Sequence, residues 1–490
     1  MFPRCDIIRN ENPQKCFPGG SLKPDRMKAV KILLIYPSQL YAPFWGRINA
    51  VKPHMVGLFS FLLRYGIRAE VLDLENELGR PEDADGIFEF KEGARRLISG
   101  YDFDIAAISC YTSLNYLSSL MVAQICRSAR KDCSVVVGGY HPSALPQDFI
   151  YTDTPFDFVV NGEGETALLH ICRGGNKKNT ERPRLIQGPA LDLRHMAGLD
   201  WQRYPYVDPH RRSHIYLSRG CPYRCVFCGE SSKLDSGRWR SYPVDEGISE
   251  IKRLISYRDP RQIGICDACF GFDKAWRRGL LAGLIKNKID KILAAEMRVD
   301  LLDKDDIDLF SRLNFNVILG IESCSGEMLR IMGKSRSPRR YLERSREVIS
   351  YMNKKGVPYK LYLIFNHPGE TRKTYAATIE FLESIITAQR KFSGYIIAQN
   401  YAFFPGSHIH INLRQYEAQC GTVIYHREWW KERNDHNVSA RDLLPSSDLY
   451  VRAGTNKYWE KDIAGLNRRI FEKMPPAVRA FWWEAFSKEA

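Results

Sequence analysis

The sequence lacks any long apolar run. No stretch reaches the roughly 18 consecutive apolar residues that a membrane-spanning helix needs. The first twenty residues, MFPRCDIIRNENPQKCFPGG, are polar and have no apolar core, which argues against a secretory signal. In a chain of this kind, 13 cysteines indicate thiols kept for packing or metal binding rather than disulfides. We therefore expect a cytoplasmic protein without a membrane span.

The sequence also lacks internal repeats, low-complexity segments and a compact basic patch interleaved with aromatic residues. Lysine and arginine number 72 against 57 aspartate and glutamate residues, a net charge of +15. Because this excess is spread along the chain, we do not expect nucleic acid as a partner. Its positive sign favours an anionic substrate, and we expect a small molecule or a peptide of that charge. With 490 residues, the chain is long enough for two or three domains.

Residues 30–180 alternate short β-branched runs with helical stretches, which is typical of a parallel sheet with helical crossovers. Five strands are expected there, in a Rossmann-like (flavodoxin-like) doubly wound α/β domain that follows an N-terminal extension, 1–29. In such folds ligands bind at the carboxyl ends of the strands. The informative loops are therefore Ser109–Thr112, Gly138–Ser143 and Asn161–Glu165.

A second series of strands and helices begins after a linker, 181–212. Six strands within 213–412 predict a partial (β/α)6 barrel of the TIM type, whose reactive end lies at the carboxyl ends of its strands. Residues 413–490 cluster tryptophan and phenylalanine among charges and show no strand period. We expect this last region to be mainly helical and to cap the barrel over the substrate.

The segment SRGCPYRCVFCGE, 218–230, places three cysteines within eight positions, directly after the first barrel strand. Thiolates bind soft metals, but structural zinc normally takes four ligands. Cys266 and Cys269 could complete a zinc site only from across the fold. A four-iron cluster held by three thiolates instead keeps one iron open for a substrate or cofactor. The three cysteines are Cys221, Cys225 and Cys228.

The motif CPYRCVFC resembles the CxxxCxxC signature of the radical S-adenosylmethionine (SAM) superfamily. AAEMRVD and LGIES are similar to that family's third and fourth strand segments, NHPGET to its common PGET turn, and FFPGS to the PGT near its sixth strand. The resemblance implies a [4Fe–4S] cluster on the three cysteines, with SAM on the open iron as the source of a 5′-deoxyadenosyl radical. It also implies an electron donor such as flavodoxin or ferredoxin. The candidate SAM contacts are Phe227, Asp267, Glu296, Arg298 and Glu322.

Those charged residues lie at strand ends, where an internal salt-bridge network is the alternative role. Two further thiols, Cys269 and Cys324, are expected near the barrel mouth. One hypothesis is that a thiol there donates hydrogen or binds an intermediate. Inert burial is the alternative.

No GxGxxG follows the first strand, so the doubly wound domain lacks the dinucleotide fingerprint. The segments SCYTS, VVVGGYHPSALP and NGEGETALL resemble the cobalamin-binding domain that precedes many radical SAM barrels. An ordinary flavodoxin-like domain with glycine-rich turns is the alternative. Glycines would let the backbone approach a large ring and its buried nucleotide tail. The candidate cobalamin contacts are Ser109, Thr112, Ser113, Gly138, Gly139, His141, Gly162, Glu163 and Gly164.

KPHMVG, 52–57, has the histidine and glycine of the cobalt-ligating motif DxHxxG but carries Lys52 in place of the aspartate. Without a carboxylate to orient the imidazole, ligation is disfavoured. We therefore interpret His54 as the first turn of a helix rather than as the lower axial ligand of cobalt.

The combined resemblance is to cobalamin-dependent radical SAM enzymes, of the class B methyltransferase type. It implies methylation of an unactivated carbon, or of phosphorus, through the 5′-deoxyadenosyl radical and methylcobalamin. One alternative is a cyclase or ring-rearranging oxidoreductase with the same cofactors but no methyl transfer. Another is a methylthiotransferase acting on RNA or protein, which needs a second cysteine triad; Cys110, Cys126 and Cys133 lack the close spacing for one. A pure binding or electron-transfer module would leave the strand-end charges without a role.

Overall fold

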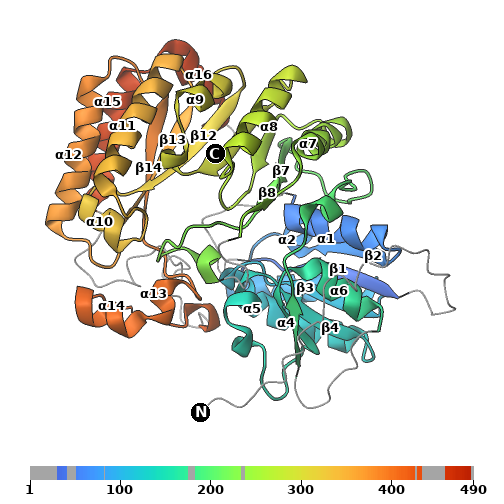
Figure 1. Cartoon of the computed structure of the whole chain (residues 1–490). Helices are drawn as coiled ribbons and strands as arrows, with labels where there is room; N and C mark the ends of the chain where they lie inside the picture. The colour runs from blue at the N-terminus through green and yellow to red at the C-terminus, as the bar shows by residue number, and fades with distance from the viewer. Residues whose placement is uncertain are drawn as a thin grey trace.

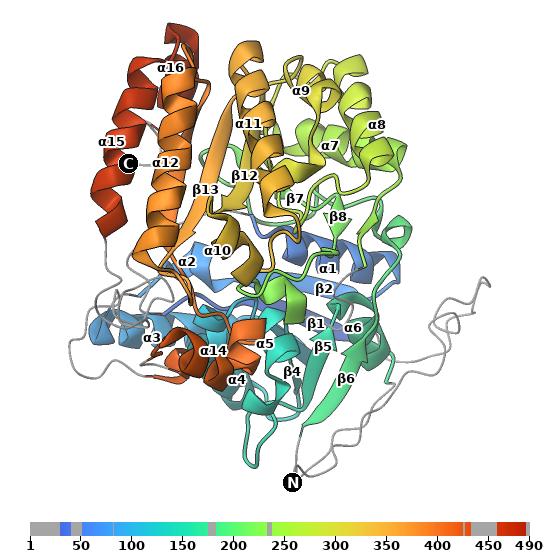
Figure 2. The same ribbon diagram turned by 60° about the vertical axis from the view of Figure 1, so that its left-hand side comes forward.

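Two parallel sheets with their helices form two layers of the molecule (Figures 1 and 2). The structure is a computed structural model that describes residues 30–40, 51–81, 83–174, 183–232, 238–424, 427–432 and 458–486. The expected N-terminal extension, 1–29, lies outside these residues. No helix within the described segments combines the length and apolarity needed to cross a membrane.

The first sheet has six parallel strands in the order β2-β1-β3-β4-β5-β6. Its central strands are buried on both faces, which explains why they are continuous apolar runs rather than alternating ones. The expected doubly wound fold is confirmed. Its helices and strands are β1 (Lys31–Tyr36), α1 (Pro53–Arg64), β2 (Arg68–Asp73), α2 (Leu74–Leu78), α3 (Ala84–Ser99), β3 (Ile105–Ser109), α4 (Tyr116–Ala129), β4 (Ser134–Gly138), α5 (Tyr140–Ala144), β5 (Phe158–Gly162), α6 (Gly164–Cys172) and β6 (Arg184–Gly188).

Strand β6 lies within the segment that the sequence suggested as a linker. It pairs in parallel with β5, from Phe158 opposite Arg184 to Gly162 opposite Gly188. The strand is short and half polar, so its sequence gives little sign of a sheet edge. The first sheet therefore continues to Gly188, beyond the five strands expected.

The second sheet is the partial barrel. Its six parallel strands follow chain order, β7-β10-β11-β12-β13-β14, and all six were predicted. Between β7 and β10 a two-residue antiparallel ribbon, β8 with β9, brackets the cysteine loop. The elements are β7 (Arg212–Ile215), β8 (Ser218–Arg219), β9 (Arg240–Ser241), α7 (Val244–Arg258), β10 (Gln262–Ile265), α8 (Lys274–Lys286), β11 (Ile292–Met297), α9 (Lys304–Phe310), β12 (Phe315–Glu322), α10 (Gly326–Ile331), α11 (Pro338–Lys355), β13 (Tyr359–Phe365), α12 (Arg372–Ala388) and β14 (Gly394–Asn400).

The chain after β14 divides into two parts. Helices α13 (His408–Ile411) and α14 (Leu413–Cys420) lie beside the first domain, where the following short turn η7 (Trp429–Lys431) is anchored to it. Trp430 donates a hydrogen bond from Nε1 to Asp148 Oδ2 over 2.7 Å, and Lys431 Nζ lies 2.8 Å from Asp148 Oδ1.

Helices α15 (Tyr458–Glu472) and α16 (Pro476–Phe486) stand beside α12 (Figure 2). Trp459 stacks on Phe365 of β13, and Trp482 donates a hydrogen bond to the Ser393 carbonyl just before β14. Helical structure was predicted for this region. The described helices nevertheless extend the barrel wall beyond β14, where we had expected a cap over the mouth.

The free edge of β14 is closed by one side chain of α15. Asn467 accepts a hydrogen bond from the Ile396 amide over 2.9 Å and donates one to the Ile396 carbonyl over 2.8 Å. This pair satisfies two backbone groups that an edge strand would otherwise leave unpaired.

Replacing that side chain should loosen the barrel edge. We expect Asn467→Ala to lower the free energy of unfolding by about 1–3 kcal/mol, because two partly buried backbone groups lose their partners. Amide hydrogen exchange in the β14 peptide should accelerate in parallel. Arg468→Ala, an exposed change on the same helix, is the matched control; equal exchange in both variants would contradict the assignment.

Candidate functional site

A cavity opens where the carboxyl ends of the two sheets face each other. It encloses about 1320 Å³ of space between atoms, including solvent at its mouth. The first domain contributes the ends of β3, β4 and β5, and the barrel contributes the segments after β7 and β10. Both domains therefore line one site.

One part of this cavity is a deep apolar slot beneath the glycine turns. Leu34, Ala107 and Val136 occupy matching positions on neighbouring strands and form its floor. Side chains of α1 and α6, among them Met55 and Leu168, form the opposite wall.

The turns after β4 and β5 bring backbone to the cavity wall. Gly139 has φ +124° and Gly162 has φ +105°, conformations that other residues rarely adopt. A Cβ on Gly139 would collide with the Cys110 carbonyl, and one on Gly162 with the Gly188 carbonyl. Ser143 ties the two turns together by donating to the Gly139 carbonyl over 2.7 Å and accepting from the Gly162 amide over 3.0 Å.

Six of the nine predicted cobalamin contacts line the cavity. They are Ser109, Gly138, Gly139, Gly162, Glu163 and Gly164.

The other three predicted contacts, Thr112, Ser113 and His141, are not in the cavity wall. His141 is buried beneath it, with Nδ1 2.7 Å from Ser113 Oγ and Nε2 3.2 Å from Asp148 Oδ2. Thr112 caps the short turn η2 (Ser113–Asn115). These polar groups have hydrogen-bond partners inside the first domain, and their contact with cobalamin stays a prediction.

His54 lies in the first turn of α1, as predicted, and it also lines the cavity. Its Nε2 is 3.1 Å from Ser109 Oγ, and its ring stacks on Tyr111 with centroids 4.2 Å apart. Burial lowers the pKa of His54 to about 3, helped by the charges of Lys52 and Arg219, so the imidazole is neutral.

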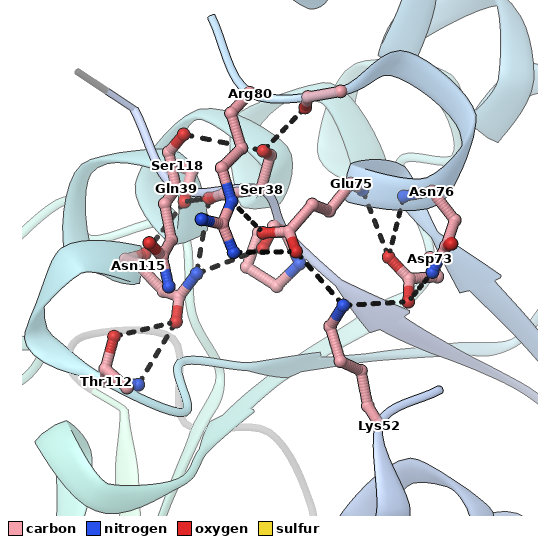
Figure 3. A network of polar contacts seen from close by, with 12 residues as sticks. Ser38, Gln39, Lys52, Asp73, Glu75, Asn76, Arg80, Thr112, Asn115 and Ser118 are labelled. Carbon is pink, nitrogen blue, oxygen red and sulfur yellow. Dashed lines mark hydrogen bonds and ion pairs between the residues drawn. The ribbon is translucent and has the colours of Figure 1, made fainter. Parts of the chain in front are cut away.

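Lys52, which stands where a cobalt-ligating motif has aspartate, points toward the carboxylates of Glu75 and Asp73 (Figure 3). Its ammonium lies 3.0 Å from Oε1 of Glu75, in α2, and 3.8 Å from Oδ2 of Asp73, the last residue of β2. Arg80 forms two further hydrogen bonds to Glu75, of 2.9 and 3.0 Å. Residue 52 therefore serves a buried ion-pair network of the fold and offers His54 no carboxylate.

The three cysteines lie on the loop between β8 and β9, on the barrel side of the cavity. The Cys228 amide donates a hydrogen bond to the Cys225 carbonyl over 3.1 Å, and the Val226 amide donates one to the Met332 carbonyl over 3.0 Å. These bonds fix the loop against the end of α10. All three thiols are free cysteines, and none is exposed.

A fourth thiol touches this loop. A hydrogen bond from Cys269 lowers the pKa of the Cys221 thiol to about 7, and the same contact raises the pKa of Cys269. Cys269 is therefore next to Cys221 of the cysteine loop. Cys324 is buried in the barrel core, where its amide is 3.3 Å from Thr378 Oγ1, and it does not line the cavity.

Arg298, a predicted SAM contact, holds the cysteine loop in place. Its guanidinium stacks on the Tyr223 ring at 3.7 Å, lies 3.9 Å from Cys225 Sγ and donates a hydrogen bond of 2.6 Å to the Lys334 carbonyl. Asp300 receives two more hydrogen bonds from it, both of 2.9 Å. All three nitrogens of the guanidinium therefore have a partner inside the protein.

Two other predicted residues also have internal partners. Asp267 accepts hydrogen bonds from the Leu217 amide over 2.8 Å and from Ser218 Oγ over 2.6 Å, which fixes the start of the cysteine loop. Burial raises the pKa of Asp267 to about 6. Glu322 pairs with Lys334 over 2.9 Å. The salt-bridge alternative thus describes Glu322, and Asp267 supports the loop.

Glu296 and Phe227 keep surface available at the barrel mouth. Glu296 is exposed at the surface of the site. Desolvation by the protein around its carboxyl group raises the pKa of Glu296, and the nearby Glu322 carboxylate raises it further. Phe227 is half-buried and meets His367 edge to face at 6.0 Å. Of the predicted SAM contacts, Glu296 is exposed, and Phe227 is partly buried without an ion-pair partner of the kind that Glu322 has.

The cysteine loop fits a cluster better than a single ion. Within the described residues, no three histidine, cysteine, aspartate or glutamate side chains converge on one point. A four-iron cluster separates its ligands further than one ion does, and three thiolates on one loop are its characteristic donors. Cys110, Cys126 and Cys133 are buried in the apolar core of the first domain, and among the described residues they form no second cysteine triad.

Sequence reasoning missed the charged residues that join the two domains at this cavity. Arg219 stands two residues before the first cysteine of the motif, and Glu230 stands two residues after the last. Arg240 lies opposite Arg219 in the antiparallel ribbon of β8 and β9. Their closeness to the motif was the available signal. Their partners, on a different domain, could not be known from spacing.

The two glycines of the turn after β4 should respond differently to alanine. Gly139→Ala should destabilise the first domain by at least about 1–3 kcal/mol, because the new Cβ forces a strained backbone against the Cys110 carbonyl. Gly138→Ala places its Cβ at an ordinary 3.4 Å from Val160 and should fold normally. Thermal unfolding of both variants measures the difference, and equal melting temperatures would refute the backbone constraint.

Comparison with known proteins agrees with this geometry. The B12 binding domain family matches residues 61–171, and the radical SAM superfamily matches residues 215–382. The chain is 27% identical to an uncharacterized methyltransferase of Pyrococcus horikoshii over 388 residues, 73% of this chain and 79% of the relative.

Two solved structures share the fold. The radical SAM methyltransferase TsrM of Kitasatospora setae, with cobalamin and a [4Fe–4S] cluster bound, aligns with a TM-score of 0.66 at 16% identity over 92% of each chain. The cobalamin-dependent SAM radical enzyme OxsB aligns with a TM-score of 0.57 at 14% identity, over 82% of this chain and 63% of OxsB. The order of the two domains, their shared cavity and the three-cysteine loop lead to one assignment: the chain belongs to the cobalamin-dependent radical SAM enzymes.

Proposed function

We propose that the protein methylates an unactivated carbon, or a phosphorus, of a small biosynthetic intermediate. The observation that carries the proposal is the shared cavity. Its one wall is the glycine turns of the B12 binding domain, and its other wall is the start of the cysteine loop together with the end of β10. A group held on the first wall faces a substrate held at the barrel mouth, which suits direct transfer between them.

In this proposal the cavity holds cobalamin. Gly138, Gly139 and the Gly162–Gly164 turn would support the corrin, because backbone without side chains can approach a large planar ring closely. The apolar slot beneath them would take the nucleotide tail. The neutral His54 and Ser109 would lie beside the ring.

Cys221, Cys225 and Cys228 would hold the [4Fe–4S] cluster. When bound, the cluster and SAM would supply the radical, and cobalamin would supply the methyl group. Arg298 and Asp267 act on the loop rather than on a ligand: the first holds Cys225 and Tyr223, and the second holds Leu217 and Ser218. Glu296 and Phe227, which keep open surface, are the better candidates for contact with SAM.

A reductant is required by the cofactor set, and we infer a flavodoxin or ferredoxin as electron donor. The excess of 15 positive charges favours an anionic donor surface and an anionic substrate, such as a carboxylate or phosphate.

The proposal is tested with anaerobically reconstituted protein, methyl-deuterated SAM and a reductant. Candidate carboxylate and phosphate metabolites are offered, and products are analysed by mass. We expect a trideuteromethyl group in place of one hydrogen, with both 5′-deoxyadenosine and S-adenosylhomocysteine formed. Cys225→Ala is the control and should yield neither product.

Other outcomes would replace the proposal. A substrate consumed with 5′-deoxyadenosine but without label indicates a cyclase or ring-rearranging oxidoreductase. A product that gains sulfur together with the methyl group indicates a methylthiotransferase.

The lower axial position of cobalt is tested by electron paramagnetic resonance of the cob(II)alamin-loaded protein. Because Ser109 engages Nε2 and no carboxylate orients the ring of His54, we expect no protein nitrogen splitting. His54→Ala should therefore leave the hyperfine pattern unchanged. Nitrogen splitting that disappears in this variant would show that His54 ligates cobalt.

A further inference from the structure

The cysteine loop is joined to the first domain at both of its ends. Arg219, two residues before Cys221, places Nη1 3.2 Å from Glu163 Oε2 and Nη2 2.7 Å from Glu165 Oε1. Glu230, two residues after Cys228, accepts a hydrogen bond of 2.9 Å from the Tyr140 hydroxyl. We name these three contacts, two made by Arg219 and one by Glu230, the loop clamp.

The partners in the clamp belong to the two turns that line the cavity. Glu163 is the middle residue of the Gly162–Gly164 turn, and Tyr140 directly follows Gly139. Each end of the cysteine loop therefore contacts one of the two turns expected to carry cobalamin. Ser143 links those turns to each other, so the clamp and the turns form one connected set.

The clamp has little freedom to rearrange. Glu163 also accepts hydrogen bonds from Arg240, 2.5 Å away, and from the Leu191 amide, 2.8 Å away. Burial would raise the pKa of Glu163, but the two guanidiniums outweigh it and lower the pKa below its ordinary value. The Glu165 side chain is only 4% exposed, so separating it from Arg219 would leave a buried charge without its partner.

We propose that Arg219 and Glu230 are positioning residues that couple the cobalamin cavity to the cysteine loop. The proposal rests on the cofactor sites of the proposed function. Any movement of the glycine turns on cobalamin binding passes through the clamp to the residues that flank the cysteines. The coupling is reciprocal by thermodynamic necessity: SAM bound at the loop strengthens cobalamin binding by the factor by which cobalamin strengthens SAM binding.

The test measures binding without turnover. The dissociation constant of hydroxocobalamin is determined on cluster-reconstituted protein with and without saturating SAM, and the SAM constant with and without cobalamin. The coupling ratio is each dissociation constant without the other ligand divided by the constant with it. For the unmodified protein we expect the two coupling ratios to be equal and about tenfold, within the usual range for coupled sites. Ratios of one would overturn the proposal.

Variants locate the coupling in the clamp. Arg219→Gln and Glu230→Gln should bring the ratio close to one, whatever their effect on either affinity alone. Arg219→Lys keeps the charge but cannot bridge two carboxylates, so its ratio should lie between one and the value of the unmodified protein. Tyr140→Phe removes only the hydroxyl and tests the Glu230 contact if Glu230→Gln fails to fold.

The matched control is Arg203→Gln, which breaks an exposed ion pair with Asp200 and should keep the full ratio. If Arg219→Gln and Tyr140→Phe both keep the ratio of the unmodified protein, the proposal is overturned. A reduced ratio in Arg203→Gln as well would assign the effect to general destabilisation and also overturn it. Because no product is measured, the result is independent of whether the protein transfers methyl groups.

Discussion

In a parallel sheet every segment that follows a strand emerges at the same edge, and this chain sets two such edges against each other. The turns after β3, β4 and β5 meet the segments after β7 and β10 around one cavity. The two ends of the cysteine loop then lie within ion-pair or hydrogen-bond distance of the glycine turns. Fold, cavity and cysteine loop are therefore one arrangement, and the proposed chemistry depends on it.

Several residues whose types suggest ligands have partners inside the protein and help to build the site. Lys52 joins a buried ion-pair network, Asp267 fixes the start of the cysteine loop, and His141 fills its hydrogen bonds beneath the cavity. Buried polar groups need such partners, because an unpaired one costs about 1–3 kcal/mol. The side chains that keep open surface, such as Glu296 and Phe227, are consequently the better candidates for ligand contact.

The sequence predicted the features that depend on local pattern. Buried apolar strands such as ILLI in β1, the six barrel strands and the helix start at His54 follow from periodicity and turn residues. It could not predict β6, which is short and half polar, nor the packing of α15 along β14, which depends on the Asn467 contact. Pairing of Arg219 with Glu163 and Glu165 also required the structure, because those residues are more than fifty positions apart.

The central claim is that one cavity brings the cobalamin face to the barrel mouth. A crystal structure of the anaerobically reconstituted protein with cobalamin and SAM tests it most directly. The account predicts the corrin against Gly138–Gly139 and Gly162–Gly164, with its tail in the slot above Leu34 and Ala107 and its upper face toward the SAM-bound cluster. A corrin bound elsewhere, or with the protein closing its upper face from the barrel, would contradict it.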